Sequence, residues 1–309
     1  MLDTLERLSH DPRTSPFVYA FVVLLGLLWG SFANVCIYRW PPSDDHPNGR
    51  SVVKPGSHCF ACKQPIAWYD NVPLLSWLWL RGQCRACKAP FSARYLLVEA
   101  LTGILFGLAW YVTVGLLRGF EPFDARLVRW TVYAGFSFVM VVTTFIDIDH
   151  KLILNKLMIP SIVIFYVLGA YVLHRGWLGG AIGIAVGYGV PWLIGFIYFL
   201  VTKRDGLGLG DSMLLALVGA LLGWKGVVVS LCGGSMVGSV IGIFILWRAR
   251  RDAPPGPEEA ATPEDTDGDE APSLMRTELP FGPYLAFAAT FYLFAEPWIE
   301  LHFALFGPG

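Results

Sequence analysis

Long apolar runs separated by short polar stretches dominate the pattern of this chain. About 20 consecutive apolar residues are needed for a helix to cross the hydrocarbon layer of a membrane. Eight segments approach or exceed that length, with 212–223 the shortest: 16–38, 96–117, 128–147, 157–174, 178–201, 212–223, 226–247 and 281–300. The pattern predicts an all-α polytopic membrane protein with about eight transmembrane helices.

Two hydrophilic stretches interrupt these runs. Residues 39–95 have the size of a small domain, whereas 252–278 are rich in Pro, Glu, Asp and Ala and lack apolar residues for a core. The second composition is typical of disorder. We therefore expect an N-terminal segment with the first transmembrane helix (1–38), a small polar domain (39–95), and a membrane core (96–309) that includes a disordered acidic loop at 252–278.

Composition and charge agree with a membrane protein and indicate its orientation. Hydrophobic residues make up 55% of the chain and charged residues only 15%, against about 25% charged in soluble proteins. The net charge of −1 gives no general attraction to nucleic acid. With 39–95 inside, sixteen of the 23 Lys and Arg residues fall on the inner side. The excess of Lys and Arg in cytoplasmic loops then places both termini outside and 39–95 in the cytoplasm.

Four cysteines in the polar domain form two CxxC pairs, Cys59 with Cys62 and Cys84 with Cys87. This spacing is close to that of zinc ribbons, in which four thiolates complete a tetrahedral shell around one structural zinc ion. Two disulfides are the alternative, although the reducing cytosol disfavours them. The other two cysteines, Cys36 and Cys232, lie in apolar runs and are expected to be small core residues.

Two carboxylates lie beside segments that must span lipid. Asp147 ends the run 130–146, and Asp211 precedes the run 212–223 and follows Gly208 and Gly210. An ionisable group near the bilayer is costly and usually functional. The simpler interpretations are that Asp211 is a helix N-cap and that Asp147 marks the water boundary together with Asp149.

A pair of carboxylates has a defined chemistry if the two groups meet. Two such groups a few ångströms apart do not both ionise easily, so one remains protonated and polarises a carbonyl while the other activates water. The glycines before Asp211 allow an extended substrate backbone to approach. Glu99, one turn inside the second span, is a third acid that either lines the substrate path or makes a structural polar contact.

Several motifs follow one another along the chain, and their order resembles that of the type IV prepilin peptidases. The first-helix motif, the cysteine box, two aspartate motifs and a closing motif carry the resemblance: Gly30–Arg39, Pro55–Cys87, Arg94–Glu99, Phe145–Asp147, Gly208–Asp211 and Leu279–Ala286. This family consists of membrane aspartyl proteases with a Gly-x-Gly-Asp motif, and the resemblance covers most of the chain.

The resemblance implies a function and its residues. Asp147 and Asp211 would be a catalytic dyad that cleaves a short basic leader after Gly from prepilins and pseudopilins, at the cytoplasmic face of the inner membrane. Many relatives then methylate the new N-terminus with S-adenosylmethionine, for which no binding residue can be assigned beyond the region 55–95. The chain departs from the family pattern at Leu154, where Pro is frequent, at Met213, where Lys is frequent, and at Phe60, where Pro is frequent.

Three alternatives remain beside this interpretation. The nearest is a peptidase that lacks methyltransferase activity. An ion-coupled transporter would use intramembrane acids as a proton relay, and a zinc-stapled scaffold would dock partners without catalysis. The sequence does not specify the oligomeric state, the particular pilin, or whether the product serves pili, secretion or DNA uptake.

Overall fold

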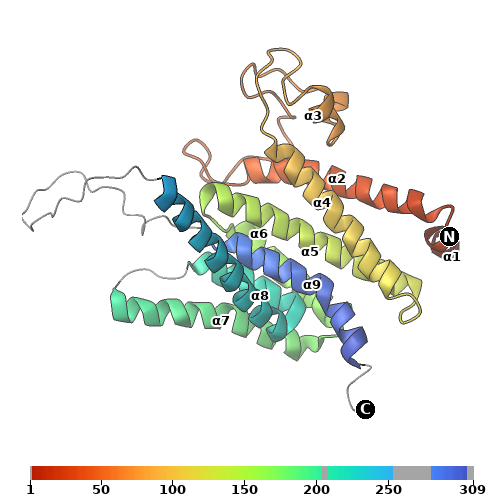
Figure 1. The fold of residues 1–309 in the computed structure, drawn as a ribbon, viewed down its shortest axis with the longest axis vertical. Helices are drawn as coiled ribbons and strands as arrows, with labels where there is room; N and C mark the ends of the chain where they lie inside the picture. The colour runs from red at the N-terminus through yellow and green to blue at the C-terminus, as the bar shows by residue number, and fades with distance from the viewer. Residues whose placement is uncertain (1, 204–207, 253–279, 305–309) are drawn as a thin grey trace, which may run out of the picture.

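A computed structural model of the chain describes residues 2–203, 208–252 and 280–304, which form a bundle of helices without a regular β-strand (Figure 1). The acidic stretch predicted to be disordered, 252–278, lies outside these residues except for Asp252. The α-helices are α1 (Leu2–His10), α2 (Ser15–Arg39), α3 (Leu75–Trp79), α4 (Arg94–Trp110), α5 (Phe123–His150), α6 (Asn155–Tyr171), α7 (Gly176–Thr202), α8 (Leu209–Asp252) and α9 (Gly282–Ala304).

All eight predicted segments are helical, and the polytopic helical class is confirmed. Five helices are long and apolar enough to cross a membrane, namely α2, α4 with its π-helical continuation Tyr111–Leu116, α5, α7 and α8. The segments 212–223 and 226–247 share the label α8, but they are two helical stretches joined at a kink, as predicted. The backbone of α8 leaves helical geometry at Gly223, where φ is 69° and ψ is −173°, a conformation that glycine adopts without a Cβ penalty.

Helix α5 lies at the centre of the bundle. Within its most apolar window 72% of the residues are buried, more than in any other of the five long helices. It packs against α2, α4, α6 and α9, and its fully buried side chains include Tyr133, Phe136 and Met140. A functional group on α5 is therefore held by packing on several sides.

Helices α7 and α8 pack with their backbones in close contact. A Cβ atom added at Gly183 would lie 2.1 Å from the carbonyl oxygen of Gly219, and one added at Gly219 would lie 2.0 Å from the carbonyl oxygen of Gly183. Small residues are the usual means by which membrane helices approach this closely. The contact fixes α8, which carries Asp211, against its neighbour.

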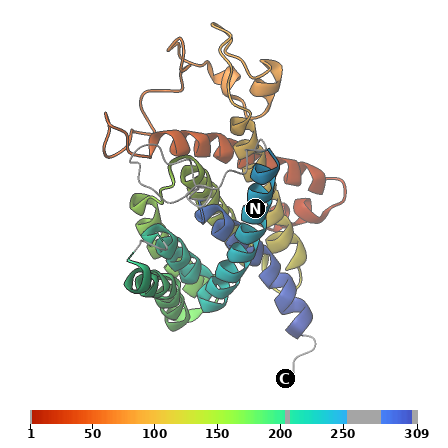
Figure 2. The same ribbon diagram turned by 60° about the vertical axis from the view of Figure 1, so that its left-hand side comes forward.

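The polar segment between α2 and α4 projects from one end of the bundle, as Figures 1 and 2 both show. It contains the 3-10 turn η1 (Trp68–Asn71) and α3. Arg39, the last residue of α2, holds the start of the segment by donating to the backbone oxygens of Ser51 and Gly56 at 3.0 and 3.3 Å. This segment is the one predicted as a small polar domain, and its size and position follow from its lack of long apolar runs.

Candidate functional site

The two aspartates predicted to form a pair come from different helices and meet at one end of the bundle. Asp147 lies in the last turn of α5 and is buried, whereas Asp211 lies in the first turn of α8 and is half-buried. The two carboxyl groups are close enough for Asp147 to exert a repulsive charge interaction on Asp211. The fold thus brings together two acids that are distant in the sequence.

The start of α9 completes this site. The backbone N–H of Gly282 donates a hydrogen bond to the Asp147 carboxyl group. A Cβ atom at Gly282 would lie only 2.5 Å from Oδ2 of Asp147, so no larger residue fits without displacing the carboxyl group. Oδ2 itself is buried without a hydrogen-bond partner among the described residues, as expected for an atom that would bind a substrate or water.

Ile153, in the connection between α5 and α6, joins these elements. Its Cβ atom lies 3.0 Å from the position of a Cβ on Gly210, and its Cδ1 atom lies 3.5 Å from that of a Cβ on Gly282. Gly208 is more open, since a Cβ there would lie 3.7 Å from Oδ2 of Asp211. Gly210 and Gly282 are therefore the glycines with little or no space for a side chain. They let the first turns of α8 and α9 approach Ile153 and Asp147.

The simpler interpretation of Asp211 as a helix N-cap is wrong. Helix α8 begins at Leu209, so Asp211 is inside the first turn and is not the N-cap. Asp147 is only 6% exposed, and the three residues that follow it on α5 are exposed. Asp149, two residues further on, points elsewhere and forms a 2.5 Å ion pair with Arg94.

Glu99 does not belong to the aspartate pair. It lies on α4, is buried, and its Oε2 accepts a hydrogen bond from the backbone N–H of Leu74 at 2.9 Å. The Ser31 side chain on α2 also hydrogen-bonds to it. Glu99 therefore connects α2 and α4 to the polar segment, and it lines the cavity beneath that segment.

The four cysteines of the two CxxC pairs form one cluster. Their Sγ atoms all lie within 4.8 Å of one another, and those of Cys59 and Cys87 are 3.7 Å apart. In a tetrahedral zinc site with Zn–S bonds of about 2.3 Å, the sulfur atoms are about 3.8 Å apart. The donor set therefore fits zinc. The distance of 3.7 Å is much longer than a disulfide bond of about 2.05 Å.

The electrostatics of the cluster differ between its thiols. Against a hydrogen bond from the Ala89 backbone, burial and the neighbouring thiols raise the pKa of Cys87 to about 11. Hydrogen bonds from the backbone of Cys62 and Ala61 lower the pKa of Cys59 to about 6, against the opposing effect of burial. A thiol with such a pKa is largely thiolate at neutral pH, which is the form that binds a metal ion. The remaining cysteines differ from each other: Cys36 is fully buried, as predicted, but Cys232 is exposed on α8, so its assignment to the core is wrong.

Sequence reasoning alone did not reveal the roles of Gly282, Ile153 and Arg94. The Arg94 guanidinium donates to the backbone oxygen of Phe145 at 3.2 Å, which ties the start of α4 to the last turns of α5. Gly282 and Arg94 do fall within motifs singled out in the sequence. Ile153 carries no such signal, because its importance arises only from contacts with α8 and α9.

The chain is similar to known proteins over most of its length. One family model, described as bacterial peptidase A24 N-terminal domain, matches residues 24–113, and another, described as type IV leader peptidase family, matches residues 134–243. A protein of Aeromonas hydrophila named prepilin leader peptidase/N-methyltransferase is 37% identical over 298 residues, which cover 88% of this chain and 89% of the relative. The chain belongs to the type IV leader peptidase family.

Other members of the family are similar over nearly the whole chain. A protein of Myxococcus xanthus is 32% identical, with 92% of both chains covered, and one of Stutzerimonas stutzeri is 32% identical, with 92% of this chain and 91% of the relative covered. Both carry the name prepilin leader peptidase/N-methyltransferase. No solved structure matches this leader peptidase. The family resemblance stated from the sequence motifs is thus confirmed.

Proposed function

We propose that this membrane peptidase removes the short basic leader of type IV prepilins and pseudopilins after Gly, using Asp147 and Asp211 to activate water. The observation that carries the proposal is the meeting of the two carboxyl groups at one end of the bundle, with the Gly282 N–H on Asp147. The family membership and the names of the relatives support the substrate class.

In the proposed reaction the two carboxyl groups share one proton. The ionised carboxyl takes a proton from water as the water oxygen attacks the scissile carbonyl carbon, and the protonated carboxyl donates its proton to the carbonyl oxygen. Collapse of the tetrahedral intermediate returns a proton to the leaving nitrogen and breaks the C–N bond. The Gly282 N–H orients Asp147, and no covalent enzyme intermediate forms.

The same proposal places the reaction at the cytoplasmic face of the inner membrane. The excess of Lys and Arg on one side of the helices puts the polar segment and both aspartates in or near the cytoplasm. A basic leader attached to a hydrophobic helix would lie there, with its helix in the lipid. This arrangement also argues against an ion-coupled transporter, whose acids are expected near the membrane midplane.

Two further parts of the proposal concern zinc and methylation. The cluster of Cys59, Cys62, Cys84 and Cys87 would hold one zinc ion, and because four thiolates complete its shell, the ion would be structural. The relatives' names include N-methyltransferase, which supports transfer of a methyl group from S-adenosylmethionine to the new N-terminal amine.

The first experiment is co-expression with a prepilin that has a Lys-Gly-Phe junction, followed by intact-mass measurement of the product. The wild-type enzyme is expected to remove the leader and add one methyl group. Asp147→Asn and Asp211→Asn should each abolish cleavage while the protein still accumulates in the membrane. Asp149→Asn is the matched control, because this carboxylate is ion-paired with Arg94 and is expected to leave cleavage largely intact.

The outcomes separate the alternatives. Normal processing by either dyad variant would exclude the proposed mechanism. Loss of the leader without methylation would indicate a peptidase that lacks the transferase activity. An uncut prepilin beside a folded wild-type enzyme would favour another substrate, the transporter or the scaffold.

A further inference from the structure

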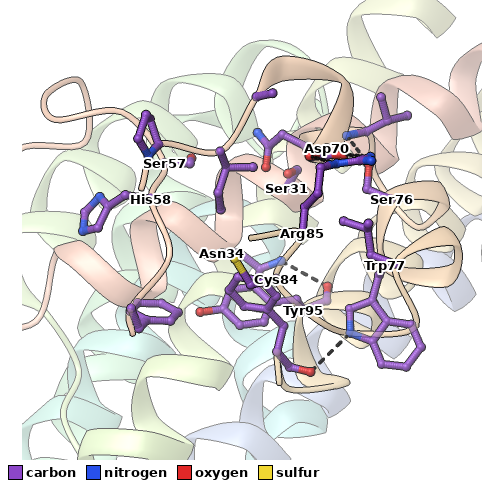
Figure 3. Close-up of a pocket in the computed structure, with 18 of the residues that line it drawn as sticks. Ser31, Asn34, Ser57, His58, Asp70, Ser76, Trp77, Cys84, Arg85 and Tyr95 are labelled. Carbon is purple, nitrogen blue, oxygen red and sulfur yellow. Dashed lines mark hydrogen bonds and ion pairs between the residues drawn. The ribbon is translucent and has the colours of Figure 1, made fainter. Parts of the chain in front are cut away.

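A cavity lies between the polar segment and the helices beneath it (Figure 3). Its volume is about 370 Å³, within the range of roughly 300–1,000 Å³ found for small-molecule sites. Helices α2 and α4 form one wall with Asn34, Tyr95 and Glu99, and the polar segment forms the other with η1, Trp77 and the second CxxC turn. None of the residues of the aspartate pair lines it.

Aromatic side chains line this cavity from both walls. They include Tyr38, Phe60, Tyr69, Trp77, Phe91 and Tyr95. The Trp77 Nε1–H donates to the Phe91 backbone oxygen at 3.4 Å, and the Arg85 guanidinium lies 5.6 Å from the centre of the Tyr69 ring. The flat faces of aromatic rings bind a nucleobase by stacking and attract a cation.

Two carboxyl groups line the cavity, and only one of them has a cationic partner. Asp70 is neutralised by Arg85, which donates to both of its oxygens at 2.7 and 2.5 Å (Figure 3). Glu99 is buried, and its hydrogen-bond partners, the Leu74 N–H and the Ser31 side chain, are neutral. Neither of these partners of Glu99 is a cation, so a positively charged ligand in the cavity would supply the complement that a buried carboxylate needs.

Resting on the methyltransferase part of the proposed function, we infer that this cavity binds S-adenosylmethionine. Its aromatic walls would hold the adenine ring, and Glu99 would face the positively charged sulfonium. The cavity also lies at the correct end of the molecule. Tyr95 in its wall is next to Arg94, which contacts Phe145, two residues before Asp147.

The methyl transfer balances without a further reactant. The lone pair of the neutral N-terminal amine, formed by cleavage, attacks the methyl carbon, and the C–S bond breaks as its electron pair passes to sulfur. The products are the methylated amine, which loses one proton to water, and the neutral thioether S-adenosylhomocysteine. Glu99 stabilises the cationic donor more than the neutral product, so product release is favoured after transfer.

Isothermal titration of the purified, zinc-loaded chain in detergent tests this inference without requiring catalysis. The ligands are S-adenosylmethionine and S-adenosylhomocysteine. Tyr69→Ala should weaken both by about tenfold through lost stacking. Glu99→Gln should weaken the sulfonium ligand by about tenfold and the thioether much less, because only the former carries the charge.

Matched controls keep the test specific. Trp68→Ala removes the neighbouring aromatic ring, which is 83% exposed and does not line the cavity, and should bind both ligands as the wild type does. Asp211→Asn should also bind normally although it does not cleave. Zinc content and the thermal unfolding midpoint establish that each variant is folded.

Three results would overturn the inference. The first is that folded Tyr69→Ala and Glu99→Gln bind both ligands as tightly as the wild type does. If the wild type still cleaves and methylates, the proposed function would stand without this cavity. The second is normal donor binding by these variants with loss of cleavage, which would assign the cavity to the peptide substrate. The third is that the wild-type chain binds neither ligand. If the wild type also fails to methylate prepilin, the methyltransferase part of the proposed function falls as well.

Discussion

Position 282 has no space for a side chain. A Cβ atom there would lie 2.5 Å from Oδ2 of Asp147, so Gly282→Ala must displace either the carboxyl group or the start of α9. Small misplacements of catalytic groups can reduce rates by roughly a hundredfold, and we expect a loss of that order in leader removal, measured with purified enzyme and prepilin. Gly189→Ala on α7, where a Cβ would meet no atom within 4 Å, should behave as wild type.

The Asp70–Arg85 pair predicts a dependence of stability on pH. Hydrogen bonds from Arg85 lower the pKa of Asp70 in the folded protein. The pair therefore stabilises the fold above the unfolded pKa of about 3.9, and this contribution is lost as the pH falls through the lower folded value. In thermal unfolding scans, Asp70→Asn should lose stability at neutral pH and converge with wild type at the acidic end. Asp44→Asn, at an exposed site, should follow the wild type throughout.

At the scale of the element, the cysteine cluster replaces a hydrophobic core in the polar segment. Between residues 40 and 95 only five residues are buried, which gives little apolar packing: Pro41, Cys59, Pro73, Gly82 and Cys84. Cys62→Ser and Cys87→Ser should therefore lower the metal content well below one zinc per chain and lower the unfolding midpoint. Metal analysis and thermal scans measure both, and Cys232→Ser on the exposed face of α8 is the control. A metal-free but equally stable wild type would contradict the assignment.

The elements were largely predictable because their signals are local. Apolar run length located every long helix, and CxxC spacing located the cysteine cluster. The kink within α8 was predictable for the same reason, since Gly223 and the polar Lys225 separate two apolar runs, and the backbone leaves helical geometry at Gly223. The N-cap assignment of Asp211 failed because α8 begins two residues earlier, after Gly208.

At the scale of the whole molecule, a polar contact joins the α6–α7 connection to α9. Arg175 forms an ion pair with Glu296, whose Oε1 also accepts a hydrogen bond from the Tyr292 hydroxyl at 2.8 Å. Removing one partner of a buried pair costs about 3–5 kcal/mol, and a smaller loss is expected for Glu296→Gln because the Arg175 side chain is 20% exposed. Thermal unfolding in detergent measures the effect. An equal loss in the control Glu300→Gln, at an exposed position, would contradict it.

The site as a whole could be predicted only in part. Asp147 and Asp211 carried a signal because carboxylates beside apolar runs are unusual, and their pairing followed from the family resemblance. The contacts of Gly282 with Asp147 and of Ile153 with Gly210 join residues distant in the sequence. No local pattern encodes such contacts, and the same holds for the cavity between Glu99 and Trp77.

The position of Gly282 also has a consequence for biosynthesis. The ribosome makes α5 and α8 before α9, so both aspartates exist in the nascent chain before the N–H that orients Asp147 has been synthesised. A chain interrupted before α9 would carry both acids without the group that positions one of them. Under the proposed dyad mechanism, such a chain is expected to cleave prepilin poorly even though both aspartates are present.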